Sequence, residues 1–402
     1  MAVIKEHGEF PVIESAKGSV GIVETRHFTF AHPPRPFTFE SGESLGPVTI
    51  AYETYGELNE AGDNVILIEH ALTGSAHVAG RHNPEDKYPG WWDVMVGPGR
   101  AFDTERYFVL CSNVLGGCYG TTGPSSIDTK SNPESNPKSD PKSGIPYGLR
   151  FPLVSVRDMV RAQKQLIDHL GIKRLRSIAG GSLGGMQALD WAVLYPEMVD
   201  SLILIATAPK ATPQSIAIHK VGIQAIMDDP DWNDGDYYGS NIPRRGLAVA
   251  RMLGHITYLS DGWLWEKFGR KHIEKQSDER GFGSKFEIES YLDYQGKKFV
   301  ERFDANTYLY LMRAIDLYDA SAGFPSLVDS LTRIKCRKVL VSSFTSDWLY
   351  PSYQSQEIVN ALVANDLDVS YCEIDSLYGH DSFLLEHEKL TYFITNFLTS
   401  LG

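Results

Sequence analysis

The chain has 402 residues, of which 42% are hydrophobic and 22% are charged, as in an ordinary folded protein. Its formal net charge of -13 disfavours nucleic acids and anionic membranes as partners. No apolar run approaches the ~20 residues that cross a bilayer, and the N-terminal residues lack a secretory signal pattern, so we expect a cytoplasmic protein.

The first half of the chain alternates strand-like runs with segments of helical period. Four runs rich in Val and Ile have the pattern of buried parallel strands, and they cover residues 64–70, 106–113, 175–181 and 200–208. Residues 156–172 repeat their apolar side chains at helical spacing and end near Gly171, a typical helix stop. This alternation predicts an α/β fold with a mostly parallel central sheet flanked by helices.

The segment 210–335 has a different pattern. It contains no strand-like run, and helical stretches such as GLAVARMLGHITYLS and NTYLYLMRAIDLYD dominate it. Strand-like runs return at residues 338–344 and 368–374, and a final helix is expected from about residue 386 to 401. We therefore predict a sheet domain made of residues 1–209 and 336–402, with residues 210–335 inserted as a helical lid.

A G-x-S-x-G motif, Gly180 to Gly184, joins the strand-like run at 175–181 to a helix-like segment. In this context the motif forms a sharp turn that exposes the serine hydroxyl, and its glycines let the strand and helix pass closely. A bare G-x-S-x-G also occurs by chance as a simple strand-to-helix turn. The strand before it and the helix after it favour Ser182 as a nucleophile.

A serine nucleophile needs a general base, and the base needs an acid that orients it. In the α/β-hydrolase fold these residues follow in the order Ser, Asp, His, each after a strand. Asp347 follows the run at 338–344, and His380 follows the run at 368–374. We therefore predict the α/β-hydrolase fold with the catalytic triad Ser182, Asp347 and His380.

Acyl chemistry also needs N–H donors aimed at the developing oxyanion. The run at 64–70 opens into the sequence HALTG, where this fold usually supplies one such amide. The second donor is expected on the residue after the nucleophile. We assign the oxyanion hole to the backbone N–H groups of Leu72 and Leu183.

No metal site or disulfide framework is predicted. The four cysteines are scattered without CxxC spacing. His77 and His255 lack metal-ligand spacing with other His or Cys residues. Packing or surface roles are expected for both histidines, with a place in the pocket as the alternative for His77.

Eight motifs in a fixed order make the sequence resemble the homoserine O-acyltransferase family. They are HALTG, WWDVMVGPG, SNVLGGCYGTTGPSS, GGSLGGMQALDWA, ARMLGHITYLS, YQGKKFVERFDANTYL, SDWLYP and YGHDSFL. The match runs from about Phe28 to the C-terminus. The main departure is a Ser-Asx-Pro-Glu/Lys repeat at residues 131–144, which we expect to lengthen an exposed loop.

The resemblance implies homoserine O-acetyltransferase activity in methionine biosynthesis, by a two-step ping-pong transfer. Ser182 would take the acyl group from acetyl-CoA and pass it to the γ-hydroxyl of homoserine, with His380 acting first as base and then as acid. The resemblance also implies that Arg251 holds the carboxylate of the amino acid and that Asp381 holds its ammonium group. Acetyl-CoA would be a co-substrate, with no permanently bound cofactor, and relatives in the family are homodimers joined through the lid helices.

Other interpretations stay open on the sequence. A succinyl donor needs a cation for its second carboxylate, and the residues at 348–350 carry none where succinyl-type relatives have Arg, which favours acetyl. Serine as acceptor differs from homoserine by one methylene, which discriminates by only about 1 to 3 kcal/mol. An esterase would use the same triad and oxyanion hole, although a lid that excludes water favours transfer. A binding protein that kept the fold is disfavoured because the triad is complete.

Overall fold

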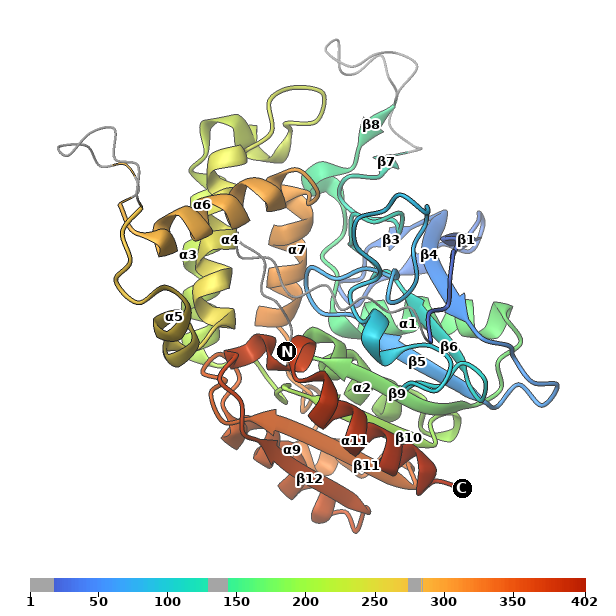
Figure 1. Ribbon diagram of the computed structural model, residues 1–402. Coiled ribbons are helices and arrows are strands. Elements are labelled where there is room, and N and C mark those ends of the chain that lie inside the picture. The colour runs from blue at the N-terminus through green and yellow to red at the C-terminus, as the bar shows by residue number, and fades with distance from the viewer. Residues whose placement is uncertain (1–17, 129–143, 274–282, 284) are drawn as a thin grey trace.

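An eight-stranded sheet forms the centre of the computed structural model, which describes residues 18–128, 144–273, 283 and 285–402 (Figure 1). The strand order is β1-β4-β6-β5-β9-β10-β11-β12. These strands are β1 (Arg26–Phe30), β4 (Val48–Tyr55), β5 (Val65–Glu69), β6 (Phe108–Ser112), β9 (Leu175–Gly181), β10 (Ser201–Ile205), β11 (Lys338–Phe344) and β12 (Val369–Ile374). All neighbours from β6 to β12 are parallel, whereas β4 is antiparallel to both β1 and β6. The predicted mostly parallel sheet is therefore confirmed, and each strand-like run of the sequence contains a strand.

The sheet is buried on both faces because its strands present apolar side chains alternately to either side. On β5, Val65 and Leu67 belong to one buried apolar cluster, whereas Ile66 and Ile68 belong to another. Successive side chains of a strand point to opposite faces, so the two clusters lie on the two faces of the sheet. The helices that cover the sheet are α1 (Val156–His169), α2 (Leu183–Leu194), α9 (Ser352–Val363) and α11 (His387–Thr399). Helices α1, α2 and α9 contribute to the first cluster, and α11 contributes to the second.

Helix α1 shows how the local sequence sets the ends of an element. The Ser155 hydroxyl accepts the Asp158 N–H, and the Asp158 carboxylate accepts the Ser155 N–H, which together form a capping box. After the last helical residues comes Gly171 with a φ of 71°, a conformation that glycine adopts without strain. The helix predicted over 156–172 therefore begins where expected and ends three residues early, just before its glycine stop.

Six α-helices occupy the described part of residues 210–335, between β10 and β11. They are α3 (Pro213–Met227), α4 (Arg244–Tyr258), α5 (Asp261–Phe268), α6 (Glu287–Val300), α7 (Ala305–Asp316) and α8 (Leu327–Leu331). Helix α3 packs against α4 and α7, and α4 packs against α6. Figure 1 shows α3 to α7 grouped together at one side of the sheet. The two helical stretches expected in this segment lie in α4 and α7, while the division into domains stays a prediction.

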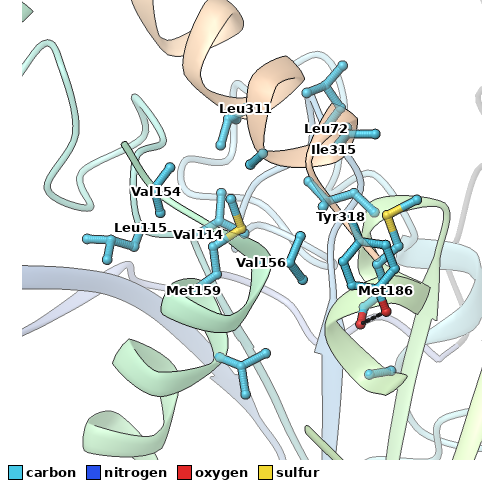
Figure 2. Close-up of a cluster of buried hydrophobic side chains, with 14 of the residues drawn as sticks. Leu72, Val114, Leu115, Val154, Val156, Met159, Met186, Leu311, Ile315 and Tyr318 are labelled. Atoms are coloured by element: carbon cyan, nitrogen blue, oxygen red, sulfur yellow. Dashed lines mark hydrogen bonds between the residues drawn. The ribbon is translucent and has the colours of Figure 1, made fainter. Parts of the chain in front are cut away.

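Helix α7 is joined to the sheet by the first apolar cluster. Leu311 and Ile315 from α7 pack in this cluster with Met159 from α1 and Met186 from α2 (Figure 2). The hydroxyl of Tyr318, which follows α7, donates to the Met186 carbonyl at 3.2 Å. Because α2 begins directly after Ser182, this packing fixes the inserted helices relative to the strand-to-helix turn.

Short elements complete the described chain. Two small antiparallel pairs are β2 (Phe37–Thr38) with β3 (Ser44–Leu45), and β7 (Ile127–Asp128) with β8 (Ile145–Pro146). Helix α10 (Ser382–Leu385) precedes α11, which lies within the range predicted for the final helix, about 386 to 401. The loop expected at residues 131–144 lies outside the described residues except for Gly144. Within the described ranges, no helix is both long and apolar enough to cross a membrane.

Candidate active site

Ser182 stands in a strained turn between β9 and α2, with φ 56° and ψ -123°. Positive φ is costly for a residue with a side chain, and in this turn it exposes the hydroxyl. A Cβ on Gly180 would lie 2.3 Å from the backbone of Gly184, and a Cβ on Gly184 would lie 2.1 Å from the Glu69 carbonyl oxygen. The glycines of the motif are therefore required because strand, helix and the end of β5 approach one another closely.

His380 and Asp347 meet from the turns that follow β12 and β11. His380 Nδ1 lies 2.7 Å from Asp347 Oδ2, and both side chains are buried. The other carboxylate oxygen, Oδ1, accepts the backbone N–H of Leu349 at 3.0 Å and of Tyr350 at 2.8 Å. The backbone therefore orients the carboxylate, the carboxylate orients the imidazole, and Nε2 is the ring nitrogen left for chemistry.

The electrostatic surroundings of His380 suit a group that accepts and returns a proton. Burial disfavours the charged imidazolium, but the Asp347 carboxylate outweighs burial and, together with Asp381, raises the pKa of His380 above its ordinary value. A base whose conjugate acid is stabilised takes a proton from a weak acid such as a serine hydroxyl more readily.

Ser182 lies in the same pocket as His380, but among the described residues no hydrogen bond joins their side chains. Tyr350 lines the same pocket, and its ring centre lies 4.9 Å from the His380 ring. A rotation about the Cα–Cβ bond of Ser182 would redirect its hydroxyl within this pocket. The structure thus gathers the three residues predicted as a triad, with the contact between Asp347 and His380 formed and the contact between Ser182 and His380 open.

The two residues predicted to form an oxyanion hole lie beside the nucleophile. Leu72 lines the pocket, and Leu183 follows Ser182 at the first position of α2. Over the described ranges, neither backbone N–H donates to another protein group. Both donors are therefore available to an oxygen that develops negative charge near Ser182.

His70 holds the turn that carries Leu72, a role that the sequence analysis did not predict. Its Nε2 accepts the Val114 N–H at 3.1 Å, and its Nδ1 lies 2.8 Å from the Ala71 carbonyl oxygen. Burial lowers the pKa of His70 to about 4, so the ring is neutral at physiological pH. Since Nε2 is an acceptor, Nδ1 carries the proton and donates it to the Ala71 carbonyl.

Arg251 lines the pocket from α4. Its guanidinium carbon lies 4.7 Å from the ring centre of Phe299 and 5.8 Å from that of Tyr258, and its Nη1 lies 3.5 Å from Thr73 Oγ1. Its Nε is buried and, within the described residues, has no hydrogen-bond partner. Burial lowers the pKa of Arg251. An anionic ligand in the pocket would offset this cost of burying a cation.

Asp381 directly follows His380 and lines the same pocket. Burial raises the pKa of Asp381 to about 6, although His380 and Arg251 act in the opposite direction. The pocket therefore combines a half-buried cation and a buried acid that both lack full solvation. A zwitterion with its carboxylate at Arg251 and its ammonium group at Asp381 would compensate both.

The pocket has a volume of about 120 Å³, and residues of α3, α4 and α7 line it together with residues of the sheet domain. His219 from α3 is one of them, and its Nδ1 lies 2.6 Å from Asp316 Oδ1 on α7. The sequence analysis missed this pair because its members are 97 positions apart, and no local pattern connects them. The small volume suits an acyl group or an amino acid rather than a polymer.

The histidines that the sequence analysis set aside lie elsewhere. His255 is buried, and its Nδ1 lies 3.0 Å from the Tyr291 hydroxyl. His77 does not line the pocket; it groups with Glu53 and His82, the one cluster in the described part of the chain with metal-ligand geometry.

Comparisons with known proteins agree on fold and family. A family model described as the alpha/beta hydrolase fold matches residues 64–387. The homoserine O-acetyltransferase of Deferribacter desulfuricans is 53% identical over 385 residues, which are 96% of this chain and 98% of that protein. The crystal structure of homoserine O-acetyltransferase from Bacillus anthracis superposes with a TM-score of 0.84 at 32% identity, covering 94% of this chain and 98% of the other. The crystal structure of esterase E22 superposes with a TM-score of 0.82 at 33% identity, covering 94% of this chain and all of the other.

Proposed function

Since the chain belongs to the homoserine O-acetyltransferase family of the α/β-hydrolase fold, we propose that Ser182, His380 and Asp347 carry out its acetyl transfer to homoserine. The observation that carries this proposal is the composition of one pocket. Ser182 and the oriented His380 share that pocket with a half-buried arginine and a buried aspartate. Ser182 and His380 can hold and pass on an acyl group, and Arg251 and Asp381 can hold an amino acid.

The first half-reaction loads the enzyme. The Ser182 hydroxyl turns to His380 and gives its proton to Nε2, and its oxygen attacks the thioester carbonyl of acetyl-CoA. The tetrahedral oxyanion is held by the N–H groups of Leu72 and Leu183. Cleavage of the C–S bond leaves an acetyl ester on Ser182, and the departing sulfur takes the proton from His380.

The second half-reaction reverses these roles. The γ-hydroxyl of homoserine gives its proton to Nε2 of His380, and its oxygen attacks the acetyl ester. The same two N–H groups stabilise the second tetrahedral oxyanion. Cleavage of the bond to Ser182 Oγ releases O-acetylhomoserine, and His380 returns the proton to the serine. Asp347 keeps the imidazole in the required tautomer throughout and stabilises its charged form.

Arg251 and Asp381 position the acceptor in this scheme. The guanidinium group pairs with the α-carboxylate. Its Nε, which no described residue contacts by a hydrogen bond, supports that role. The Asp381 carboxylate pairs with the ammonium group. Because Asp381 adjoins His380 in the chain, an amino acid held at this point brings its side-chain hydroxyl to the catalytic imidazole.

The charges of the pocket support acetyl rather than succinyl as the acyl group. Leu349 and Tyr350 line the pocket where a succinyl carboxylate would need a cation. Apart from His380, the basic residues of the wall are Arg251 and His219. Arg251 is assigned to the acceptor, and the Nδ1 of His219 is paired with Asp316. Among the described residues of the wall, no further basic side chain is left for a succinyl group.

Hydrolysis of an ester is the second candidate, because esterase E22 shares the fold at 33% identity. An esterase needs the triad and the oxyanion hole but no site for a zwitterion. Arg251 and Asp381 therefore favour transfer to an amino acid over transfer to water.

We also propose that two chains associate through the lid helices in the cytoplasm, where acetyl-CoA serves as a co-substrate and not as a bound cofactor. Val221 on α3 and Val249 and Ile256 on α4 are exposed apolar side chains that a second lid would cover. Sedimentation equilibrium at twice the 44.8 kDa chain mass, reduced to one mass in Val221→Asp, would support the dimer. A wild-type monomer would exclude it.

The deciding experiment measures thiol release from acetyl-CoA and succinyl-CoA with homoserine, serine or no acceptor. We expect release that requires both acetyl-CoA and homoserine and that disappears in Ser182→Ala. Acceptors that lack one charge, 4-hydroxybutyrate and 3-amino-1-propanol, should react far more slowly than homoserine. Equal release without an acceptor would instead identify a hydrolase, and preference for succinyl-CoA would overturn the assigned acyl group.

A further inference from the structure

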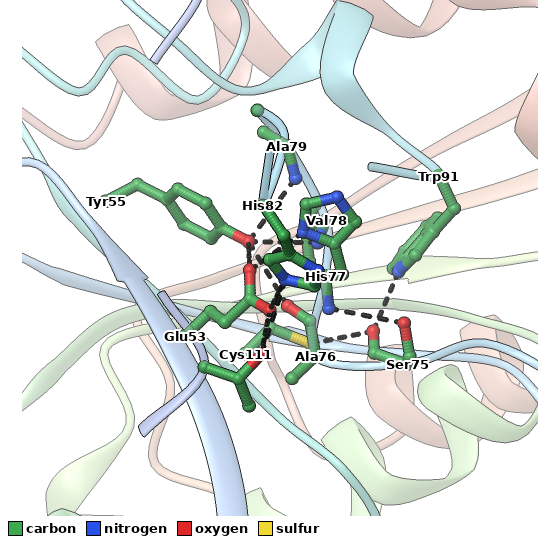
Figure 3. Close-up of polar contacts among 12 residues, drawn as sticks. Glu53, Tyr55, Ser75, Ala76, His77, Val78, Ala79, His82, Trp91 and Cys111 are labelled. Atoms are coloured by element: carbon green, nitrogen blue, oxygen red, sulfur yellow. Dashed lines mark hydrogen bonds and ion pairs between the residues drawn. The ribbon is translucent and has the colours of Figure 1, made fainter. Parts of the chain in front are cut away.

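Glu53, His77 and His82 converge on one point outside the catalytic pocket (Figure 3). Glu53 lies on β4, and its side chain is only 1% exposed. His77 Nδ1 lies 3.0 Å from Oε2 of this carboxylate, and His82 Nε2 lies 2.8 Å from Oε1. The two imidazole rings lie one over the other with centres 3.9 Å apart. Both rings thus direct one nitrogen at the same buried carboxylate.

We propose that Glu53, His77 and His82 form a binding site for a divalent transition-metal ion of the zinc type. One donor atom from each residue lies within 4.8 Å of the donors of the other two, as the ligands of a single ion do. Two imidazole nitrogens and one carboxylate oxygen are a ligand set that zinc commonly takes, with water at the fourth position. The sequence analysis predicted no metal because it compared His and Cys spacings only, and Glu53 lies 24 residues before His77.

Neighbouring hydroxyl groups hold the carboxylate in place. The Tyr55 hydroxyl donates to Oε2 at 2.9 Å, and the Thr25 hydroxyl donates to Oε1 at 2.7 Å. Metal sites commonly have such outer partners, which orient the ligating groups before the ion arrives. Tyr55 is itself fixed, because its oxygen accepts the Val78 N–H at 2.9 Å.

The proposed metal site is open to solvent, and the hydroxyl oxygen of Thr25 lies beside it. His82 is 41% exposed at its side chain, so an ion can reach the cluster from solvent past this residue. Thr25 Oγ1 lies 3.3 Å from His82 Nε2 and could become a further ligand. To bind the ion, the proton on His77 Nδ1 and that on His82 Nε2 move to the other ring nitrogens, and the lone pairs freed in this way coordinate the metal.

The position of the cluster relates it to the catalytic turn. His77 follows Gly74, the end of the HALTG turn, by three residues, and Figure 3 shows residues 75–79 around Tyr55 and Glu53. An ion bound here would tie this segment to β4. It would stiffen the chain behind the oxyanion hole without touching a substrate.

The test uses the full-length chain stripped with EDTA and then titrated with Co²⁺ as a spectroscopic probe and with Zn²⁺. We expect one equivalent of Co²⁺ to give the intense visible absorption of a four- or five-coordinate ion, and Zn²⁺ to displace it. Binding should persist in Ser182→Ala, which lacks the nucleophile, and in His32→Ala, which removes an exposed histidine outside the cluster. Binding should be lost in His82→Ala and in Glu53→Gln.

Melting temperature provides a second reading. Zn²⁺ should raise the melting temperature of the wild type and of His32→Ala, but not that of His82→Ala, whose exposed position allows the variant to fold. Absence of stoichiometric binding to the wild type would overturn the proposal. Binding of equal strength in His82→Ala would also overturn it. Because Ser182→Ala binds metal but cannot transfer acetyl, failure of this site is distinguishable from failure of the proposed reaction.

Discussion

The Asp347 carboxylate contacts His380 with one oxygen and two backbone N–H groups with the other. An amide in its place could offer Nδ2–H to His380 and so force the proton onto the wrong ring nitrogen. We predict that Asp347→Asn lowers kcat by about 10³- to 10⁴-fold with little change in KM for acetyl-CoA. Steady-state thiol release and thermal unfolding measure the two effects. A fall in kcat accompanied by an equal loss of folded protein would show a structural role only.

Arg251 is predicted to recognise the acceptor and not the acyl donor. A lysine keeps the charge but cannot form two parallel hydrogen bonds with a carboxylate. We expect Arg251→Lys to raise KM for homoserine by about 10-fold or more, which corresponds to roughly 1.4 kcal/mol, while acetylation of Ser182 proceeds at nearly the wild-type rate. Arg270→Lys is the matched control, because Arg270 is exposed, lies over the Phe286 ring and does not line the pocket. Acetylation and acceptor binding impaired to the same degree would contradict this assignment.

Protonation of Asp381 should weaken the binding of homoserine at acidic pH. Burial raises the pKa of Asp381 to about 6, so the carboxylate that binds the ammonium group is lost as the pH falls through 6. We predict that KM for homoserine rises below about pH 6, whereas kcat already declines at higher pH, because the pKa of His380 is raised above its ordinary value of 6.5. In Asp381→Asn, KM should be high at every pH and should lack this transition. Initial rates measured from pH 5 to 8 at several homoserine concentrations distinguish the wild type from this variant. A wild-type KM that is constant over this range would exclude an ionised Asp381 as the ammonium partner.

The parallel strands of the fold could be predicted because their apolar runs are continuous. Strands β5, β9, β10 and β11 are buried on both faces, and each stands out in the sequence. Strand β4 was missed because its sequence, VTIAYETY, carries polar residues that tertiary contacts compensate. Glu53 is the clearest case, since its partners Thr25 and His77 lie 28 and 24 positions away. Strand β1 was missed because it is a partly exposed edge strand.

The candidate site could be predicted where a residue follows a strand end. Ser182, Asp347 and His380 each follow a strand of the sheet, so their order along the chain indicated their meeting place. His219 and Asp316 lie on helices of the insertion, where the sequence contains no comparable positional signal. The open contact between Ser182 and His380 depends on side-chain rotamers, which residue spacing does not determine.

Gly184 should tolerate no side chain. A methyl group at this position would meet the Glu69 carbonyl oxygen at 2.1 Å and push β5 and its following turn away from α2. We predict that Gly184→Ala folds less stably and loses about 10²-fold or more in kcat, as expected when one oxyanion donor moves. Gly222→Ala on α3 is the control, because its added atom would meet neighbours at ordinary distances of 3.4 Å or more. Wild-type kcat in Gly184→Ala would contradict the close approach of strand and helix.

The contributions of the buried Glu69 and Glu53 to the free energy of unfolding should change with pH in opposite directions. Burial raises the pKa of Glu69 to about 8, although Gln163 donates to its Oε2 at 2.6 Å. The folded state therefore keeps a proton that the unfolded state loses above the ordinary glutamate pKa of 4.5. The stability that this proton provides is fully present below pH 4.5 and declines as the pH rises to about 8. Glu53 is the reverse case, because its pKa is lowered from 4.5 to about 2, and its contribution declines as the pH falls through that interval.

We therefore predict that Glu69→Gln, which resembles the protonated acid, raises the free energy of unfolding at pH 9 by on the order of 3 kcal/mol relative to the wild type, with little difference at pH 5. Glu53→Gln should lower the free energy of unfolding at both pH values, by about 3 kcal/mol, because it removes an ionised hydrogen-bond acceptor from buried donors. Urea titrations at pH 5, 7 and 9 in the presence of EDTA measure both variants without a metal contribution. Equal shifts of the same sign at pH 9 would show that the folded protein stabilises the ionised Glu69 carboxylate as it does that of Glu53, which would contradict the raised pKa of Glu69.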